Sequence, residues 1–520
     1  MISTFLSKSG KKSASCNNIN LHSPYNPERE AERFIRRRIS SRPITVLLLG
    51  PAMNYISKSF IELYPGVRVI SVYYHKFFYD ADNGFSESSA LYTDDSALHS
   101  FLQSNIDEFD LEGLSIIEWP PSSNIFKQTS ERVNTVVKDF FEQLYAGFLT
   151  TEYFGKRWIK NSIKNYLFHH DIISDFTISK PVLIIASGPS LEKSLHFIQK
   201  HESELYIAAL PSSVQFLNEY GIHIDLVITT DAGFYSSYHN KQIPNISLGK
   251  PLIAKSVTAR FDPFLSHMPA YIFGSNDSYE AHFLFSLFNN PRFIPSNGTV
   301  AGTAFDLILS KKPPYIIFAG LDFSYLDILS HARPHSFYAD FLSASNRLNP
   351  FNSILFSRHL TFSSTSKAFS TFASWFNYRS SSLQIPVYRL YPSDIPIDGM
   401  IPIDGAAADK LFFDLYGSDT HQDTLTHDID TYEKKRKIYA LIETWIASIR
   451  PIYEKNNIRC FDDLKQNVTS FVILHFSNPL LLKKIKKLYR LGKTGSADSA
   501  VAECAEDTVS FLKTLLSWCY

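Results

Sequence analysis

Four short polar segments carry residue types that bind phosphate groups or move protons, and each follows a predicted strand or precedes a predicted helix. The first is Ser187-Gly188-Pro189-Ser190. Glycine lets the backbone approach a ligand closely, and proline fixes the turn. Ser190 falls at the expected start of a helix, where unpaired amides and the helix dipole favour a phosphate. The alternative is an ordinary strand-to-helix turn with a serine cap.

The second segment is Thr230-Asp231, at the end of another predicted strand. Parallel sheets bind their ligands outside the carboxyl ends of the strands. At such a place Asp231 can orient a sugar hydroxyl or hold a divalent cation. The alternative is an Asx turn, in which the carboxylate serves only the local backbone.

The third segment, Asn297-Gly298-Thr299, stands directly before a predicted helix. Its amide and hydroxyl groups can bind a base or a phosphate. The same groups can equally form a plain helix cap. Both roles therefore stay open at this segment.

The fourth segment contains Asp322, Tyr325 and His331. Asp322 ends a strongly apolar strand, where an unpaired carboxylate would be costly, so we expect it to be paired with the protein or with a ligand. The hydroxyl of Tyr325 can steady a leaving phosphate. A histidine such as His331 titrates near neutral pH and suits the role of general base, the alternative being a solvated loop residue.

An alternation of short apolar runs and amphipathic segments places all four segments in one predicted α/β domain. The expected strands cover residues 182–186, 205–209, 225–229, 251–255, 270–273, 315–319 and 387–390, and the expected helices cover 191–200, 214–220, 299–310 and 366–378. This order predicts a mostly parallel sheet, whose strand ends gather at one edge. The four segments can then converge on one crevice. The polar stretch 325–356 is typical of a lid or binding loop.

The rest of the chain predicts further parts around this domain. Strands over 44–49, 67–74 and 114–119 indicate a second α/β domain, and four amphipathic segments after residue 430 indicate a helical region. The predicted boundaries are a flexible tail 1–26, an N-terminal α/β domain 27–133, a helical connector 134–180, a central domain 181–404 and a helical C-terminal domain 405–520.

The amino-acid composition argues against several classes of protein. The 51 Lys and Arg residues balance 51 Asp and Glu residues, which argues against a uniformly basic nucleic-acid-binding surface. A hydrophobic share of 44% excludes disorder over most of the 520 residues. The 4 cysteines contain no Cys-x-x-Cys pair, so neither a zinc site nor a disulfide framework is predicted. The first residues lack the apolar segment of a secretory signal, and no run reaches the length of a membrane span. These features predict a soluble cytoplasmic protein without a membrane partner.

The ordered motifs resemble those of the motility accessory factor (Maf) family of flagellin glycosyltransferases, which use nonulosonic acids. The motifs are Ala186-Ser187-Gly188-Pro189-Ser190-Leu191, Asp225-Leu226-Val227, Thr230-Asp231, Asn297-Gly298-Thr299-Val300-Ala301, Gly320-Leu321-Asp322-Phe323-Ser324-Tyr325 and Ser330-His331-Ala332. Two further segments, 25–33 and 154–161, resemble the amino-terminal and pre-core parts of that family. The resemblance implies two Rossmann-like α/β domains, N-terminal and central, followed by a helical C-terminal region.

The central part is also similar, more distantly, to bacterial sialyltransferases that use CMP-sialic acid, and this similarity implies a site. Ser187, Gly188, Pro189, Ser190, Thr230, Asn297, Gly298, Thr299 and Asp322 would hold the CMP donor. Tyr325 would assist the leaving group, with His331 and Asp231 as the other candidate catalytic residues. Ser187 stands where the sialyltransferases have Asn, and the resemblance does not fix the general base.

The resemblance implies transfer of a nonulosonic acid of pseudaminic, legionaminic or sialic type from its CMP-activated donor to Ser or Thr of flagellin. CMP-sugar and flagellin are then the expected partners, with no permanently bound cofactor and the need for a divalent metal left open. Archaeal proteins with a similar core are pterin pyrophosphokinases that use ATP and magnesium. That activity and a non-catalytic flagellin-binding chaperone are the two alternatives.

Overall fold

The chain folds into two compact units in a computed structural model. One unit contains Met1–Lys156 and Ile442–Trp518, here called the N-terminal unit, and the other contains Arg157–Leu441 and Cys519–Tyr520, here called the central unit. The structure describes residues 2–82, 84–246, 249–276, 278–288, 290–326, 329–350, 365–381, 383, 385–415, 425–427, 431–454 and 460–519. Each unit is described by itself below.

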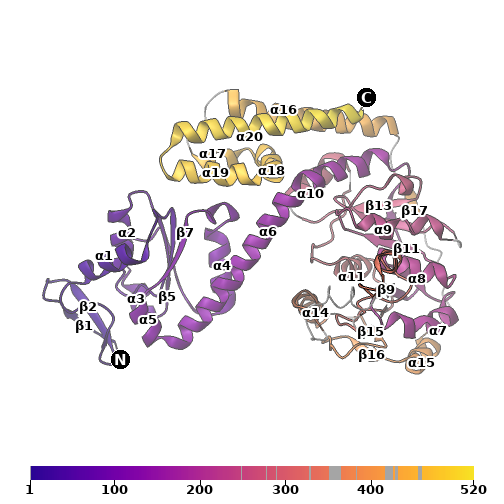
Figure 1. The fold of residues 1–520 in the computed structure, drawn as a ribbon, viewed down its shortest axis with the longest axis horizontal. Coiled ribbons are helices and arrows are strands. Elements are labelled where there is room, and N and C mark those ends of the chain that lie inside the picture. The colour runs from indigo at the N-terminus through magenta and orange to yellow at the C-terminus, as the bar shows by residue number, and fades with distance from the viewer. Residues whose placement is uncertain are drawn as a thin grey trace. The chain divides into compact units, whose positions relative to one another are not determined.

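The central unit is built on a ten-stranded sheet, as the sequence predicted for its core strands (Figure 1). In spatial order the strands are β16 (Ile401–Ile403), β15 (Val387–Leu390), β14 (Ile316–Ala319), β9 (Val182–Ile185), β10 (Tyr206–Ala209), β11 (Leu226–Thr229), β12 (Leu252–Ser256), β13 (Ala270–Phe273), β8 (Ile172–Phe176) and β17 (Leu425–His427). Neighbouring strands pair in parallel, except that β17 is antiparallel to β8.

Helices cover both faces of this sheet, because its central strands are apolar on both sides. In β9, Val182 and Ile184 pack in one core cluster with residues of α11 (Val300–Ser310) and α14 (Lys367–Ser380). The alternate residues of β9, Leu183 and Ile185, pack in a second cluster with α7 (Leu191–His201) and α8 (Val214–Glu219). Further helices among the described residues of the unit are α9 (Ser236–Asn240), α10 (Ser278–Leu287), α12 (Tyr338–Ala344) and α15 (Gly405–Leu415).

The strand order reverses at β9. From β9 the chain moves outward through β10, β11, β12 and β13, and then returns to place β14 on the opposite side of β9. Such a reversal opens a crevice outside the carboxyl ends of the two strands, the usual ligand site of doubly wound sheets. The loops after β9 and β14 are the ones that contain Ser190 and Asp322.

The N-terminal unit holds a smaller parallel sheet, which confirms the predicted second Rossmann-like part. Its strands, in spatial order, are β6 (Ser88–Leu91), β5 (Arg68–Tyr73), β4 (Thr45–Leu49) and β7 (Leu114–Glu118). Its helices are α1 (Pro27–Arg38), α2 (Tyr55–Leu63), α3 (Lys76–Asp80), α4 (Asp95–Asn105), α5 (Pro120–Ile125) and the long α6 (Lys127–Phe168), which runs on into the central unit.

The prediction that residues 1–26 form a flexible tail is wrong. Residues Ile2–Leu6, Lys12–Cys16 and Ile19–Asn20 form an antiparallel sheet of three strands, β1 to β3. Leu21 is fully buried, and its carbonyl oxygen accepts a hydrogen bond of 2.8 Å from the indole of Trp119. The segment is polar because these short strands bury only a few side chains, and composition therefore hid them.

The prediction that the C-terminal region is helical is confirmed. It contains α16 (Thr431–Glu454), α17 (Phe461–Gln466), α18 (Val468–Ser477), α19 (Pro479–Arg490) and α20 (Thr494–Leu516). Helices α17 and α18 are separate because Asn467 leaves the helical conformation and caps the second one.

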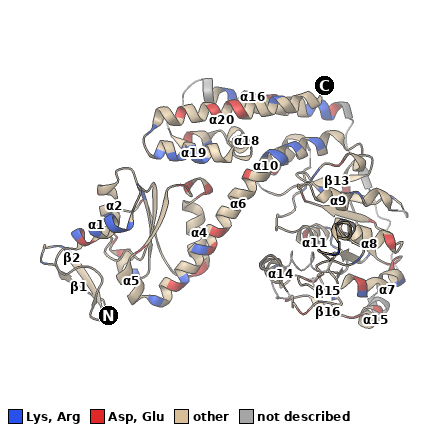
Figure 2. Ribbon diagram, viewed as in Figure 1, with Lys and Arg blue, Asp and Glu red and all other residues tan. Residues whose placement is uncertain are grey.

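Helix α19 is rich in lysine and meets acidic residues of the same unit (Figure 2). The ammonium of Lys486 lies 2.7 Å from Asp107 and 2.8 Å from Asp110. Lys486 and Asp110 are both buried, so these two charges are compensated away from water.

Three further sequence predictions need adjustment. The predicted connector 134–180 contains β8, a full member of the central sheet. The region after residue 404 contributes β17 to the same sheet. The predicted loop 325–356 contains α12, and its residues 327–328 and 351–356 lie outside the described residues. Among the helices that the structure describes, none is both long and apolar enough to cross a membrane.

Candidate active site

The loops after β9 and β14 are bonded to each other at the reversal of strand order. The amide of Ser190 donates to Oδ2 of Asp322 at 2.7 Å, and the Ser190 hydroxyl donates to Oδ1 at 2.5 Å. The amide of Gly188 donates to the carbonyl oxygen of Gly320 at 2.8 Å. Asp322 is therefore paired within the protein, one of the two outcomes that its sequence position predicted.

These bonds change the expected role of the first segment. The amides of Gly188 and Ser190, which the sequence offered to a phosphate, are committed to the neighbouring loop. Ser190 makes no side-chain cap bond to α7, and Pro189 has no amide to donate. The two committed residues hold the two loops together, while the hydroxyl of Ser187 is bonded to Ser212.

Gly188 is required by packing. A Cβ atom at this position would lie 2.5 Å from Oδ2 of Asp322 and 2.5 Å from the carbonyl oxygen of Gly320. Contacts this short force a shift, and the Gly320 oxygen belongs to the backbone, which gives way only at high cost. The absence of a side chain at Gly188 thus permits the bonds between the loops.

Burial of this junction shifts the pKa of its charged groups. Burial raises the pKa of Asp322, although its hydrogen bonds from Ser190 work in the opposite direction. Burial also lowers the pKa of Arg389 to about 10. The Arg389 guanidinium donates to the carbonyl oxygens of Leu321 at 2.6 Å and Ile395 at 2.7 Å. Arg389 was not predicted, although a charged residue inside the apolar strand 387–390 is a visible signal.

A second set of bonds connects Ser187 to the segment of His331. The Ser187 hydroxyl accepts a hydrogen bond of 2.8 Å from the hydroxyl of Ser212, which follows β10. The Ser187 carbonyl oxygen accepts a hydrogen bond of 2.8 Å from the amide of Ala332, the residue after His331. The candidate base is thereby brought to the same edge of the sheet as the first segment. Nδ1 of His331 lies 2.7 Å from the Ser330 hydroxyl.

Three histidines, His331, His335 and His239, lie in a row in which each ring is next to the following one. The ring of His331 lies 4.1 Å from that of His335, and His335 lies 5.1 Å from His239, which comes from α9. Burial lowers the pKa of His335 to about 2, with the charges of His331 and His239 as smaller causes. Burial likewise lowers the pKa of His239 to about 4. Both rings are therefore neutral at physiological pH. No sequence signal separated His239 from the other histidines.

Asp231 and Thr230 lie at the end of β11, on the same edge. Oδ1 of Asp231 accepts a hydrogen bond of 2.6 Å from the amide of Gly233, which is the Asx turn that the sequence left as an alternative. The charge of Asp231 raises the pKa of His239, against the larger effect of burial. Asp231 thus serves the local turn and contributes negative charge beside the row of histidines.

The third segment forms a helix cap. The Thr299 hydroxyl accepts a hydrogen bond of 2.8 Å from the amide of Gly302, and Oδ1 of Asn297 accepts one of 3.2 Å from Thr303. Helix α11 leads directly into β14, so this cap lies toward the carboxyl edge of the sheet. Gly298 has a positive φ of 76° and open space around it. The cap is confirmed, and contact with a nucleotide stays a prediction.

Tyr325 follows β14 and packs beside α14. Its ring lies 5.3 Å from that of Phe369 at an angle of 45°. The Thr365 hydroxyl donates to the carbonyl oxygen of Phe323 at 2.8 Å, which holds the same stretch of chain. Tyr325 therefore lies near the end of β14 and beside α14. The segment of His331 is held near the end of β9 by the bond from Ala332 to Ser187.

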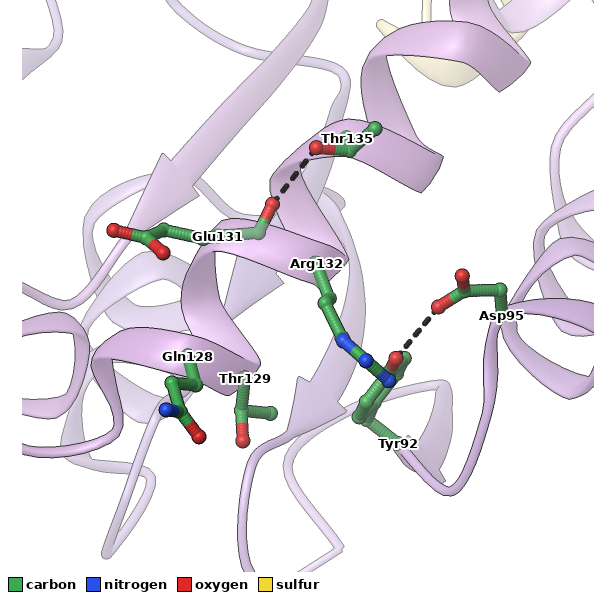
Figure 3. Close-up of a pocket in the computed structure, with 7 residues that line it drawn as sticks. All are labelled: Tyr92, Asp95, Gln128, Thr129, Glu131, Arg132 and Thr135. Carbon is green, nitrogen blue, oxygen red and sulfur yellow. Dashed lines mark hydrogen bonds between the residues drawn. The ribbon is translucent and has the colours of Figure 1, made fainter.

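The N-terminal unit has a cavity of about 700 Å³ for which the sequence gave no motif (Figure 3). It is lined by Tyr92, Asp95, Gln128, Thr129, Glu131, Arg132 and Thr135. The Tyr92 hydroxyl donates to Asp95 at 2.6 Å. The cavity is polar and of mixed charge, and it contains none of the predicted site residues.

Three comparisons with known proteins bear on this arrangement. Residues 156–327 match the family model described as 6-hydroxymethylpterin diphosphokinase MptE-like. An uncharacterized protein of Treponema pallidum (strain Nichols) is 26% identical over 280 residues, which are 54% of this chain and 60% of that protein. The chain thus spans less than two thirds of the length of this curated relative.

The third comparison concerns the whole fold. The structure of a Maf glycosyltransferase from Magnetospirillum magneticum AMB-1 matches with a TM-score of 0.55 and 10% sequence identity, covering 100% of this chain and 91% of that one. At this identity the likeness establishes the fold, and the fold is the one that the motif resemblance implied. We conclude that this chain has the fold of a Maf glycosyltransferase, with a central segment similar to the MptE-like family.

Proposed function

We propose that this protein is a glycosyltransferase that moves a nonulosonic acid from CMP to Ser or Thr hydroxyls of flagellin. One observation carries the proposal: in a fold shared with a Maf glycosyltransferase, hydrogen bonds bring Ser187 and the segment of His331 together where the strand order reverses. This is the place where doubly wound sheets bind their ligands. The sugar is of pseudaminic, legionaminic or sialic type, following the motif resemblance.

The donor is held from the carboxyl edge of the central sheet. Ser187 and Ser212 present hydroxyl groups toward the donor phosphate. Gly188 acts as a positioning residue through Gly320, and Ser190 does so through Asp322. Thr230 and the cap 297–299 contribute to the nucleotide site from the neighbouring strand and helix ends. CMP-sugar is a substrate here, so no resident cofactor is invoked.

The reaction is a displacement at the anomeric carbon of the sugar. The acceptor oxygen forms the new bond to this carbon, and the bond from the carbon to the CMP phosphate oxygen breaks. The acceptor proton passes to His331, and the electron pair leaves with CMP, whose phosphate Tyr325 stabilises by a hydrogen bond. Positioning and stabilisation of the leaving group supply most of the rate enhancement in such reactions.

The acceptor is a protein, and the helical C-terminal region is the proposed place of its presentation. Flagellin is synthesised in the cytoplasm, which is therefore the proposed location of the transfer. The proposal involves neither a nucleic acid nor a membrane as partner.

A thermal-shift titration tests the nucleotide class. We expect CMP without metal to raise the unfolding temperature, because a ligand at about 100 times its dissociation constant stabilises a fold by about 2.7 kcal/mol. ATP and GTP, each with and without Mg²⁺, serve as controls. Stabilisation by ATP with Mg²⁺ alone would indicate a pyrophosphokinase instead, and flagellin binding without any nucleotide response would indicate a chaperone.

A further inference from the structure

Helix α9, at the carboxyl edge of the central sheet, buries its small polar side chains, whereas two aromatic residues that precede it are exposed. Its polar side chains Ser236, Ser237 and Asn240 are at most 7% exposed. Phe234 and Tyr235, which lead into the helix, are 58% and 69% exposed. Two neighbouring large aromatic side chains that are exposed beside a candidate site indicate a binding surface.

Hydrogen bonds hold the polar side of α9 inward. The Ser236 hydroxyl donates to the carbonyl oxygen of Gly233 at 2.8 Å, and the Asn240 side chain donates to Oδ2 of the buried Asp262 at 2.8 Å. The bond from Asn240 to the buried Asp262 joins α9 to another segment, and turning the helix over would break it.

The exposed rings belong to a continuous aromatic wall, defined here as Phe234, Tyr235, Tyr238 and Phe337. The ring of Phe337 lies 5.3 Å from Tyr238 and 6.3 Å from Tyr235. Phe337 also lies 5.7 Å from His335, the neighbour of His331 in the row of histidines. Phe337 and His335 thus connect the aromatic wall to the proposed general base, His331.

Positively charged side chains lie over two of these rings, Phe234 and Tyr238. The Arg260 guanidinium lies 5.2 Å from the ring centre of Phe234, and the Lys241 ammonium lies 5.4 Å from that of Tyr238. Among the described residues, the rings nearest to Tyr235 meet it at 5.8 Å edge to face and at 6.3 Å. Tyr235, which is 69% exposed, therefore offers an open face beside Tyr238 and Lys241.

We infer that the aromatic wall binds the nucleobase of the donor, with the base stacked on Tyr235. This inference rests on the proposed function. A pyrimidine is planar and matches the face of a tyrosine ring, and the nucleotide to which it belongs is anionic, in agreement with Lys241 beside Tyr238. In this arrangement the ribose lies between the base on Tyr235 and the phosphate, which the proposed function places at the hydroxyl of Ser187.

Calorimetric titration of the full-length protein with two probes, CMP and ribose 5-phosphate, tests this inference. Both probes carry ribose and phosphate, and only CMP carries a base. Replacing Tyr235 by alanine should weaken CMP binding about 5- to 150-fold, the range expected for loss of one stacked base, and should leave ribose 5-phosphate unchanged. Tyr235→Phe should bind CMP like the wild type. Tyr378→Ala, at an 81% exposed tyrosine of α14, is the matched control and should change neither affinity.

The possible failures are distinguishable. A wild-type protein that does not bind CMP refutes the proposed function and this inference with it. Wild-type CMP affinity in Tyr235→Ala refutes the inference alone. Equal weakening of both probes would show that Tyr235 supports the structure rather than the base. An unchanged CMP affinity with a raised KM for flagellin would assign the wall to the acceptor.

Discussion

Replacing His331 by alanine should lower the rate of sugar transfer by about 10²- to 10⁴-fold, the usual contribution of a general base, and leave CMP affinity within about twofold. The reason is that His331 is proposed to take the acceptor proton and is not proposed to hold the nucleotide. The measurement is kcat for transfer together with the dissociation constant of CMP.

Two further variants separate chemistry from packing at this position. The His331 ring contacts His335, so alanine also removes a packed side chain. His331→Gln keeps much of the volume and should be as inactive as His331→Ala. His196→Ala, at an exposed histidine of α7 in the same unit, should behave like the wild type. A His331→Ala rate within twofold of wild type would exclude the residue from the chemical step.

The second large effect is expected at Gly188. Alanine at this position places its Cβ 2.5 Å from both Asp322 Oδ2 and the Gly320 oxygen. Overpacking of this kind typically costs about 1–3 kcal/mol of unfolding free energy. It should also weaken CMP binding at least about tenfold, because the loops after β9 and β14 must separate and Ser187 moves with them. Thermal unfolding and CMP titration of the same preparation measure both effects.

The control for Gly188→Ala is Gly147→Ala in helix α6. A Cβ at Gly147 meets nothing within 4 Å. Because alanine is the better helix former, this variant should keep its stability or gain up to about 1 kcal/mol, and it should bind CMP normally. If Gly188→Ala unfolded at the wild-type temperature and bound CMP with wild-type affinity, the bonds between the two loops would have no part in forming the site.

The framework of the central unit was predictable because its signals are local. The apolar run Val182–Ile185 is buried on both faces, as its composition requires, and Gly188-Pro189 marks the turn that follows. The cost of burying a carboxylate led to the prediction of a partner for Asp322, and the partner is Ser190. The sequence did not indicate that Asp322 would also accept a hydrogen bond from the Ser190 amide, which we had expected to bind a phosphate.

The parts that were missed depend on contacts between distant residues. The strands β1 to β3 each bury few side chains, so their polar sequence is typical of a tail. The row His239, His335 and His331 is assembled from two segments about ninety residues apart in the numbering, which no local pattern connects. The exposure of Phe234 and Tyr235 was missed because large aromatic residues are ordinarily expected in the core.

The most direct measurement of the central claim is the mass of flagellin after incubation with this protein and a CMP-activated nonulosonic acid. We expect the intact mass to rise by whole sugar residues, with release of one CMP for each sugar added, and with the new mass on Ser or Thr peptides. His331→Ala protein should leave the flagellin mass unchanged over the same time. An unchanged mass with the wild-type protein and each of the pseudaminic, legionaminic and sialic donors, under conditions where CMP binds, would contradict the proposed transfer.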